Sequence, residues 1–198
     1  MGCTRITPNK IKVVNAATLA QFMKNQCVRI DKNITTLDIQ RIYAYCNKYT
    51  NILHPLEIRN DPNDKYVAIR KNKNDKILVF AIYEDMRDVR YIHFLCKCTN
   101  ESKSCAIHNL GAILMYWIIF DAQADRTIKT IKLMAASSNS KQINLMNYYR
   151  TFGFVSKNAD SAAMILDLEA FVSRFDQISF EHKTGGKKKP QPRKKSIS

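Results

Sequence analysis

The chain has 198 residues, of which 45% are hydrophobic, and it carries a formal net charge of +15. This apolar content is enough for one folded domain and excludes a chain that is unfolded throughout, while the length leaves no room for several large domains. The positive charge favours polyanionic partners such as nucleic acid, an acidic membrane face or an anionic cofactor, although it can also serve solubility alone.

Two helices are predicted in the N-terminal part, after a short strand at residues 10–14. Asn15 is placed to cap the first helix, which runs through Cys27 with Leu19 and Phe22 on one face. The second helix starts at Thr36 and presents an apolar stripe. Residues 51–62 contain two prolines and no periodicity, which indicates a loop.

Three β-type segments follow, at residues 66–70, 77–83 and 89–98. Clusters of Asn, Asp and Lys separate them. Links of this length favour antiparallel hairpins. We therefore expect these segments to form one half of a sheet.

The most apolar segment covers residues 111–120 and is hydrophobic on every face. A helix of this kind must lie between other elements, and it is too short to span a bilayer. The strand at 89–98 precedes it, and residues 128–134, which alternate apolar and basic side chains, follow it as another strand. This order predicts a βαβ unit whose two strands are parallel neighbours.

The C-terminal part is predicted to hold a short helix that ends at Gly153, strands at 154–156 and 162–168, and a last helix at 169–180. Residues 183–198 are rich in Lys, Arg, Gly and Pro and are expected to be a disordered basic tail. The predicted organisation is one α/β domain at residues 1–182, in the order βααβββαβαββ. Its central twisted sheet is mixed and flanked by helices.

Six cysteines are scattered along the chain, and no signal peptide or long hydrophobic span is evident. This pattern favours a reducing intracellular location, cytoplasmic or nuclear. Abundant Lys, Asn and Ile suit a low-GC bacterium, a protist or a large DNA virus, so a virus-infected cell or a virion is among the expected settings. A membrane location is not expected, because Ile6 departs from the pattern for acylation of Gly2.

Residues 148–154 read Tyr-Tyr-Arg-Thr-Phe-Gly-Phe, which places Tyr149 four residues before Gly153 and a Phe directly after that glycine. Gly153 also has an independent physical reason, because a helix C-terminus favours a left-handed residue. Together with the predicted element order, this segment resembles the GNAT superfamily of acetyl-CoA-dependent N-acetyltransferases. The resemblance covers about residues 10–168.

Residues 106–114 lie where that family keeps its pyrophosphate-binding loop. Gly111 agrees with the family pattern, whereas Ala106 stands in place of Arg or Gln and Asn109 in place of the first Gly. Backbone amides at a helix N-terminus hold phosphate, and Asn tolerates left-handed conformations better than most residues. The resemblance implies that the phosphates of the cofactor are bound by Asn109, Leu110, Gly111 and Ala112.

The resemblance further implies that acetyl-CoA is a substrate and that no metal is needed. The strand ending near Leu95 and Cys96 would splay from the strand after the central helix, and the backbone of these two residues would hold the pantetheine arm and polarise the thioester carbonyl. Tyr149 would be the general acid for the leaving thiolate. Candidates for the base that accepts the amine proton are Glu84, Asp85 and His93, and water can also accept it.

A tetrahedral zinc site is an alternative use of Cys96, Cys98, Cys105 and His108. Only one residue separates Cys96 from Cys98, which departs from the usual zinc spacing, so we favour buried thiols. A disulfide between Cys98 and Cys105 is not expected in the cytosol.

Two functions remain open from the sequence. The first is transfer of an acetyl group from acetyl-CoA to a primary amine of a protein lysine, a protein N-terminus or a small molecule. The second is a catalytically inactive protein of the same fold with a nucleic-acid-associated or structural role, for example in a virion. For the latter, residues 187–195 offer salt-dependent contacts to phosphates without aromatic side chains for base stacking. The sequence does not indicate an oligomeric state.

Overall fold

The computed structural model describes residues 15–42, 61–73, 75–97, 110–135, 142–156, 158 and 161–174. Residues 36–42 are helical. The other elements, in chain order, are α1 (Ala16–Asn25), β1 (Val28–Asp31), β2 (Lys65–Lys71), β3 (Ile77–Met86), β4 (Val89–Lys97), α3 (Leu110–Ala124), β5 (Thr130–Met134), α4 (Gln142–Arg150), β6 (Val155–Ser156), β7 (Ala163–Asp167) and α5 (Leu168–Arg174).

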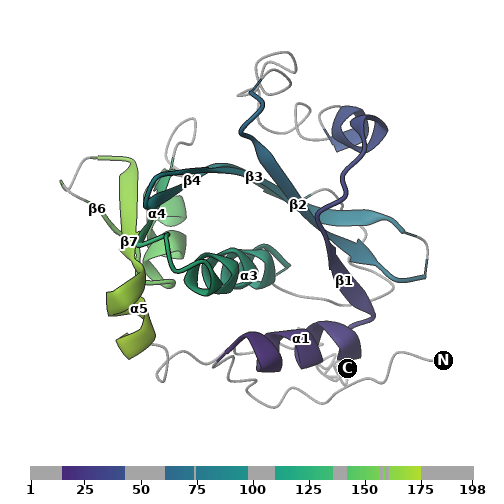
Figure 1. Cartoon of the computed structure of the whole chain (residues 1–198), viewed down its shortest axis with the longest axis horizontal. Helices are drawn as coiled ribbons and strands as arrows, with labels where there is room; N and C mark the ends of the chain where they lie inside the picture. Colours follow the sequence, from purple (N-terminus) through teal and green to yellow (C-terminus); the bar gives the residue numbers. More distant parts are fainter. Residues whose placement is uncertain are drawn as a thin grey trace, which may run out of the picture.

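The seven strands form one sheet in the order β1-β2-β3-β4-β5-β7-β6. Neighbouring strands are antiparallel except β4 and β5, which are parallel and joined through α3. This confirms the predicted mixed sheet and its central βαβ unit. Figure 1 shows α3 lying against one face of the curved sheet with α1 beyond it, and the helical segment 36–42 on the opposite side.

One strand of the sheet was not predicted. The strand expected at residues 10–14 lies outside the described residues, as do the tail and residues 51–60 of the loop predicted at 51–62. Within the described residues the sheet begins with Val28–Asp31, between α1 and the helical segment 36–42. We did not predict this strand because it has four residues, two of them charged, and its pattern is too short to show periodicity.

Helix α1 begins where the sequence indicated. The Asn15 side chain accepts a hydrogen bond from the Thr18 backbone N–H (3.0 Å), and the Thr18 hydroxyl accepts one from the Asn15 N–H (3.2 Å). This reciprocal arrangement satisfies two donors at the helix start that have no partner within the helix. Leu19 then anchors the helix in the core at 1% exposure.

The core has two parts, one on each face of the sheet, and β3 contributes to both. Its odd-numbered residues Val79, Ala81 and Tyr83 pack with α3, whereas Phe80 and Ile82 pack on the other side. Helix α3 is buried on nearly all sides, as its sequence predicted. Burial on both faces makes β3 and α3 the fixed support for the neighbouring strands.

A network of alternating charges crosses the sheet beside α3. Arg90 of β4 is only 2% exposed, and its guanidinium donates to both carboxylate oxygens of Asp85 (2.7 and 2.9 Å) and to Asp121 of α3 (2.9 Å). Lys65 extends the network to Asp85 and Lys32 extends it to Asp121, each at 2.8 Å. The network therefore joins β2, β3, β4 and α3 with the residue that follows β1.

Arg90 is held by more than ion pairs. Its third contact is to the Ile118 carbonyl oxygen (3.1 Å), and the guanidinium lies 4.4 Å from the ring centroid of Tyr83. Burial alone would raise the pKa of Asp85, but the hydrogen bonds from Arg90 and Lys65 outweigh it and lower that pKa. Asp85 is thus ionised at neutral pH and committed to the network.

Among the described residues, no helix has both the length and the apolar character needed to cross a bilayer.

Substitution Arg90→Met should reduce the free energy of unfolding by about 3–5 kcal/mol, because it leaves two carboxylates without their shared partner. Urea denaturation followed by circular dichroism measures this loss. Arg29→Met is the matched control, since Arg29 pairs with Asp75 at an exposed site and should cost less than about 1 kcal/mol. Equal effects of the two substitutions would contradict the structural role given to Arg90.

Candidate active site

Strands β4 and β5 are paired over only part of their lengths. Four residue pairs join them, from Val89 with Thr130 to Ile92 with Leu133. Beyond Ile92, β4 continues to Lys97 alongside β3, while β5 ends at Met134. Within the described part of the chain, the pairing of β4 with β5 therefore ends at Ile92, and β4 extends past the end of β5.

The separation begins at an irregularity in β4. On β3, Tyr83 lies opposite Ile92 and Ile82 lies opposite Phe94, so His93 has no residue opposite it. An extra residue of this kind bends its strand and increases the local twist. It also changes the side-chain alternation, because Ile92 packs on the α3 side whereas Phe94 packs on the other side. The bulge therefore coincides with the end of the β4–β5 pairing.

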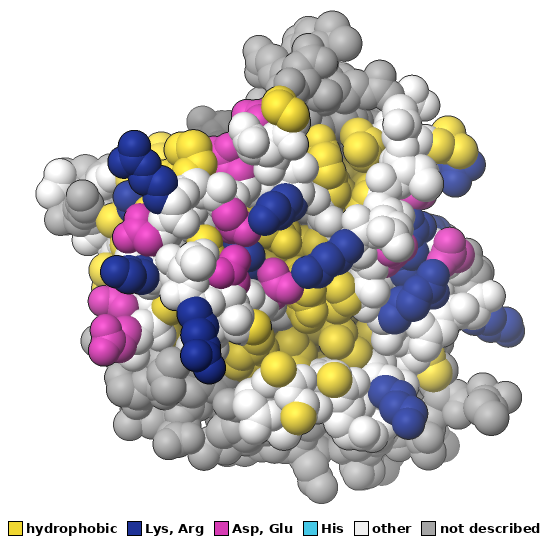
Figure 2. Space-filling view, viewed as in Figure 1, with side chains coloured by type: hydrophobic (Ala, Val, Ile, Leu, Met, Phe, Trp, Pro, Cys, Tyr) yellow, Lys and Arg dark blue, Asp and Glu magenta, His cyan; other side chains and the backbone are white. Residues whose placement is uncertain are grey.

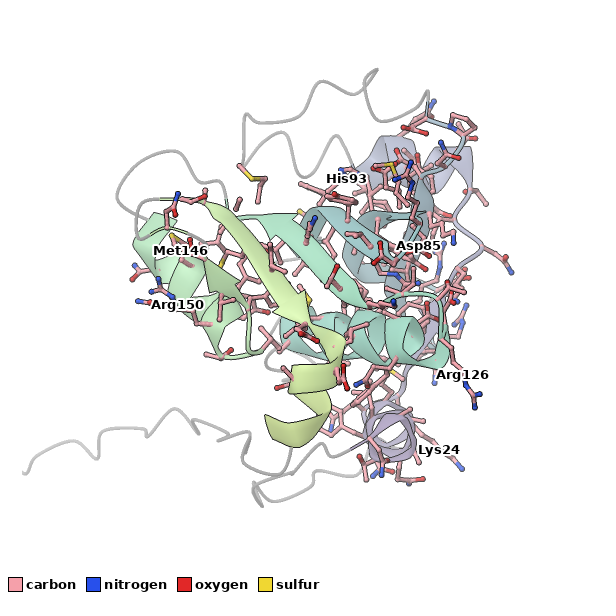
Figure 3. The ribbon with its side chains drawn as sticks, turned by 60° about the vertical axis from the view of Figure 1, so that its left-hand side comes forward. Lys24, Asp85, His93, Arg126, Met146 and Arg150 are labelled. Carbon is pink, nitrogen blue, oxygen red and sulfur yellow. The ribbon has the colours of Figure 1, made fainter. Side chains whose placement is uncertain are left out.

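Three polar side chains meet at this bulge. His93 Nε2 lies 3.2 Å from Glu84 Oε1, and Asp64, which precedes β2, places a carboxylate oxygen so that the three groups lie within 4.8 Å of one another. Glu84 is buried, and 45% of the His93 side chain is exposed. Figure 3 shows His93 on the side of the sheet away from α3, separate from Met146 and Arg150 on α4.

The electrostatics of the cluster are those of a negative site. Burial raises the pKa of Asp64, the negative charges of Asp61 and Glu84 raise it further, and His93 acts in the opposite direction. An imidazole beside a buried carboxylate is the common arrangement for moving a proton. The cluster can therefore accept a proton from a group that approaches the bulge.

The structure brings together two of the residues singled out from the sequence, Glu84 and His93. Asp85, the third candidate base, does not belong to this cluster. Arg90 and Lys65 donate hydrogen bonds to its carboxylate, so it has a structural role in the ion-pair network. The sequence did not identify Asp64 as a site residue. Asp64 lies about twenty to thirty residues before Glu84 and His93 in the sequence, and only the register of β2, β3 and β4 shows that it is close to them in space.

Leu95 and Cys96 lie on the part of β4 that has left β5. Leu95 packs toward the α3 side and Cys96 toward the opposite side, beside Phe80. Cys96 is disulfide-bonded rather than a free thiol. The other proposed zinc ligands, Cys98, Cys105 and His108, lie outside the described residues.

Helix α4 supplies two adjacent tyrosines. Tyr149 is buried, with ring contacts to Tyr148 and Phe154, and burial raises its pKa to about 12. Its hydroxyl is therefore protonated at neutral pH and is a hydrogen-bond donor. The sequence motif pointed to Tyr149 alone. Tyr148 also lies close to a predicted site residue, because a Cβ added to Gly111 would lie 3.2 Å from the Tyr148 hydroxyl oxygen.

The start of α3 contains three of the four residues assigned to phosphate binding. Leu110 and Ala112 are buried, Gly111 is partly exposed, and the first turn has no acidic side chain. A helix N-terminus of this type is compatible with an anion. Asn109, the fourth residue, lies outside the described residues.

No protein-family model matches the chain, and no curated protein is similar to it in sequence. Solved structures are similar in fold. The ribosomal-protein-S18-alanine N-acetyltransferase from Escherichia coli is 18% identical with a TM-score of 0.51, and the match covers 70% of this chain and 90% of that one. The spermidine/spermine N-acetyltransferase SpeG from Vibrio cholerae is 11% identical with a TM-score of 0.54, covering 75% and 98%.

A putative acetyltransferase of the GNAT family from Desulfovibrio desulfuricans is 13% identical with a TM-score of 0.53, covering 71% of this chain and 99% of that one. Each match covers nearly the whole of the neighbouring structure. At these identities the likeness establishes the fold. The chain has the GNAT fold, as the element order and the segment at residues 148–154 predicted.

Substitution Gly153→Ala should destabilise the protein by about 1–2 kcal/mol, because Gly153 has a φ of 89° and its new Cβ would lie 3.3 Å from Leu166 Cδ1. Thermal and urea unfolding measure the change. Gly111→Ala is the comparison, because Gly111 lies in a helix without positive φ and alanine gains up to about 1 kcal/mol in helix propensity. Its Cβ would lie 3.2 Å from the Tyr148 hydroxyl, so that gain is partly offset by a contact rather than by backbone strain, and the net loss should be smaller than for Gly153→Ala. If Gly111→Ala were the more damaging substitution, the conformational argument for Gly153 would be wrong.

Proposed function

We propose that this protein is an acetyl-CoA-dependent N-acetyltransferase that acts on a primary amine. The observation that supports the proposal is the end of the β4–β5 pairing at Ile92, with His93 and Glu84 in contact directly after it. An extended acyl donor would lie beyond this last pair, next to a proton acceptor.

The acyl donor would lie along β4 beyond its last residue pair with β5, Ile92 with Leu133. There the backbone of Leu95 and Cys96 would hydrogen-bond the amides of a pantetheine arm and the thioester carbonyl. The phosphates would lie at the start of α3, where Gly111 has no side chain and no acidic group is present in the first turn. In this arrangement the thioester lies beside the bulge.

The chemistry is a direct attack of a neutral amine on the thioester carbonyl. A C–N bond forms and the C–S bond breaks, while the amine proton passes to His93, which Glu84 orients by the 3.2 Å contact. The leaving thiolate takes a proton from the Tyr149 hydroxyl. The balance requires only the acyl donor, the amine and these two proton-transfer groups.

The acceptor is proposed at the level of the amine class. The solved structures named above include an enzyme for a ribosomal-protein alanine and one for spermidine and spermine. These acceptors share a primary amine but differ in size. Asp64 and Glu84 give the site a negative character that suits a cationic amine as it approaches, whether on a protein lysine, an N-terminus or a small molecule.

The second candidate is an inactive protein of this fold that associates with nucleic acid or has a structural role. The net charge of +15 and the departures at Ala106 and Asn109 favour it. Figure 2 shows acidic and basic side chains interspersed on the face in view, rather than a surface of one sign. Polyanion binding would then depend on the basic residues 187–195.

Acetyl-CoA at one hundred times its dissociation constant should raise the free energy of unfolding by roughly 2.7 kcal/mol. Thermal shift and calorimetry on the full chain measure this effect, with ATP as a control that has phosphates but no pantetheine arm. An unmoved melting curve with acetyl-CoA, together with a shift caused by DNA at low salt, would support the inactive alternative instead.

Substitution His93→Gln should lower kcat/KM for acetyl transfer about 10²–10⁴-fold, because glutamine keeps a polar side chain but cannot accept the proton. The measurement is steady-state acetylation of a panel of primary amines, with circular dichroism to verify folding. Arg126→Ala, an exposed position past the other end of α3, should leave the rate unchanged (Figure 3). Full activity of His93→Gln would remove His93 from the mechanism and leave water as the proton acceptor.

A further inference from the structure

Asp64, Glu84 and His93 have the composition of a metal-ligand set as well as of a proton acceptor. Each offers one ligand atom, and these atoms lie within 4.8 Å of one another although they come from three separate segments of the chain. Ligands at about 2.0–2.1 Å from a tetrahedral ion lie about 3.3 Å apart. The Glu84 to His93 distance of 3.2 Å already meets that value.

The charges of the cluster are unbalanced. Two carboxylates face one imidazole, and among the residues that the structure describes no Lys or Arg forms an ion pair with Asp64 or Glu84. The nearby Lys65 is directed to Asp85 instead, at 2.8 Å. Glu84 is only 9% exposed, so little water screens its charge. A dication would balance the two carboxylates.

An ion could reach the cluster and complete its coordination shell with water. Almost half of the His93 side chain is exposed, so solvent reaches the cluster at that residue. An exposed imidazole can rotate to shorten its distance to Asp64. One nitrogen and two carboxylate oxygens suit Zn²⁺ or Co²⁺ better than Mg²⁺, which prefers oxygen ligands alone.

We propose that Asp64, Glu84 and His93 bind one divalent transition-metal ion, Zn²⁺ or Co²⁺, in an open site with three protein ligands. The sequence did not predict this site, because Asp64 was not among the residues singled out. A further consequence rests on the proposed function: a metal-bound imidazole cannot accept a proton, so the ion and the acceptor amine would compete for the same site.

The test is a titration of the full chain with Co²⁺ in the absence of chelators, followed by absorption spectroscopy and calorimetry. We expect a d–d band from nitrogen and oxygen ligation without a thiolate charge-transfer band, which separates this site from the cysteines. His93→Gln and Asp64→Asn should each weaken this binding at least tenfold. Asp61→Asn is the matched control, because it removes a nearby charge from a residue outside the ligand set.

Several outcomes would overturn the site. These are no binding by the wild-type chain, binding only with a thiolate band, or equal affinity in wild type, His93→Gln and Asp64→Asn when all three variants are folded. Equal weakening by Asp61→Asn would indicate attraction by charge without ligation and would also reject the site.

Metal binding and acetyl transfer are measured in separate experiments, so that the two proposals can fail independently. Acetyl-CoA binding and transfer are measured with EDTA present, and Co²⁺ binding is measured without acetyl-CoA. If transfer occurs but Co²⁺ does not bind, only the metal site fails. If Co²⁺ binds but no amine is acetylated, only the enzyme proposal fails.

Discussion

One additional residue in β4 lies where its pairing with β5 ends. His93 has no partner on β3, and the pairing of β4 with β5 ends at the residue before it. Strand β5 ends at Met134, one residue after this last pair, so the bulge lies where β5 stops. Strand β3 follows β4 through the bulge, so the β3–β4 pairing continues beyond the end of β5.

Arg90, three residues before the bulge, stabilises the part of β4 that is paired with β5. Arg90 is paired with Ile131 in the sheet and joined by its side chain to Asp85 and Asp121. Helix α3 passes along the same face and supports both strands. The paired parts of the two strands are thus held together by a buried network that lies close to the last pair, Ile92 with Leu133.

The sequence was most informative where burial is uniform or periodic. The wholly apolar segment at 111–120, the alternation at 128–134 and the three strands before them were predicted close to their observed places, and the mixed sheet followed from connection lengths. Val28–Asp31 was not predicted, because four residues with two charges give no period. The site was predicted only in part: Glu84 and His93 were candidates, but their contact with Asp64 depends on the β2–β3–β4 register, which single-strand patterns do not contain.

Within the described residues, β4 runs past the end of β5 in the middle of the sheet. Exposed strand edges at the periphery invite pairing with other molecules and aggregation, and proteins commonly protect them with prolines, charges or short strands. The segment His93–Leu95 carries none of these protections. Here β3 pairs with the segment along one side, and Leu95 packs into the core that contains α3. A position inside the sheet therefore limits the risk of self-association that the same sequence would create at the border of the sheet.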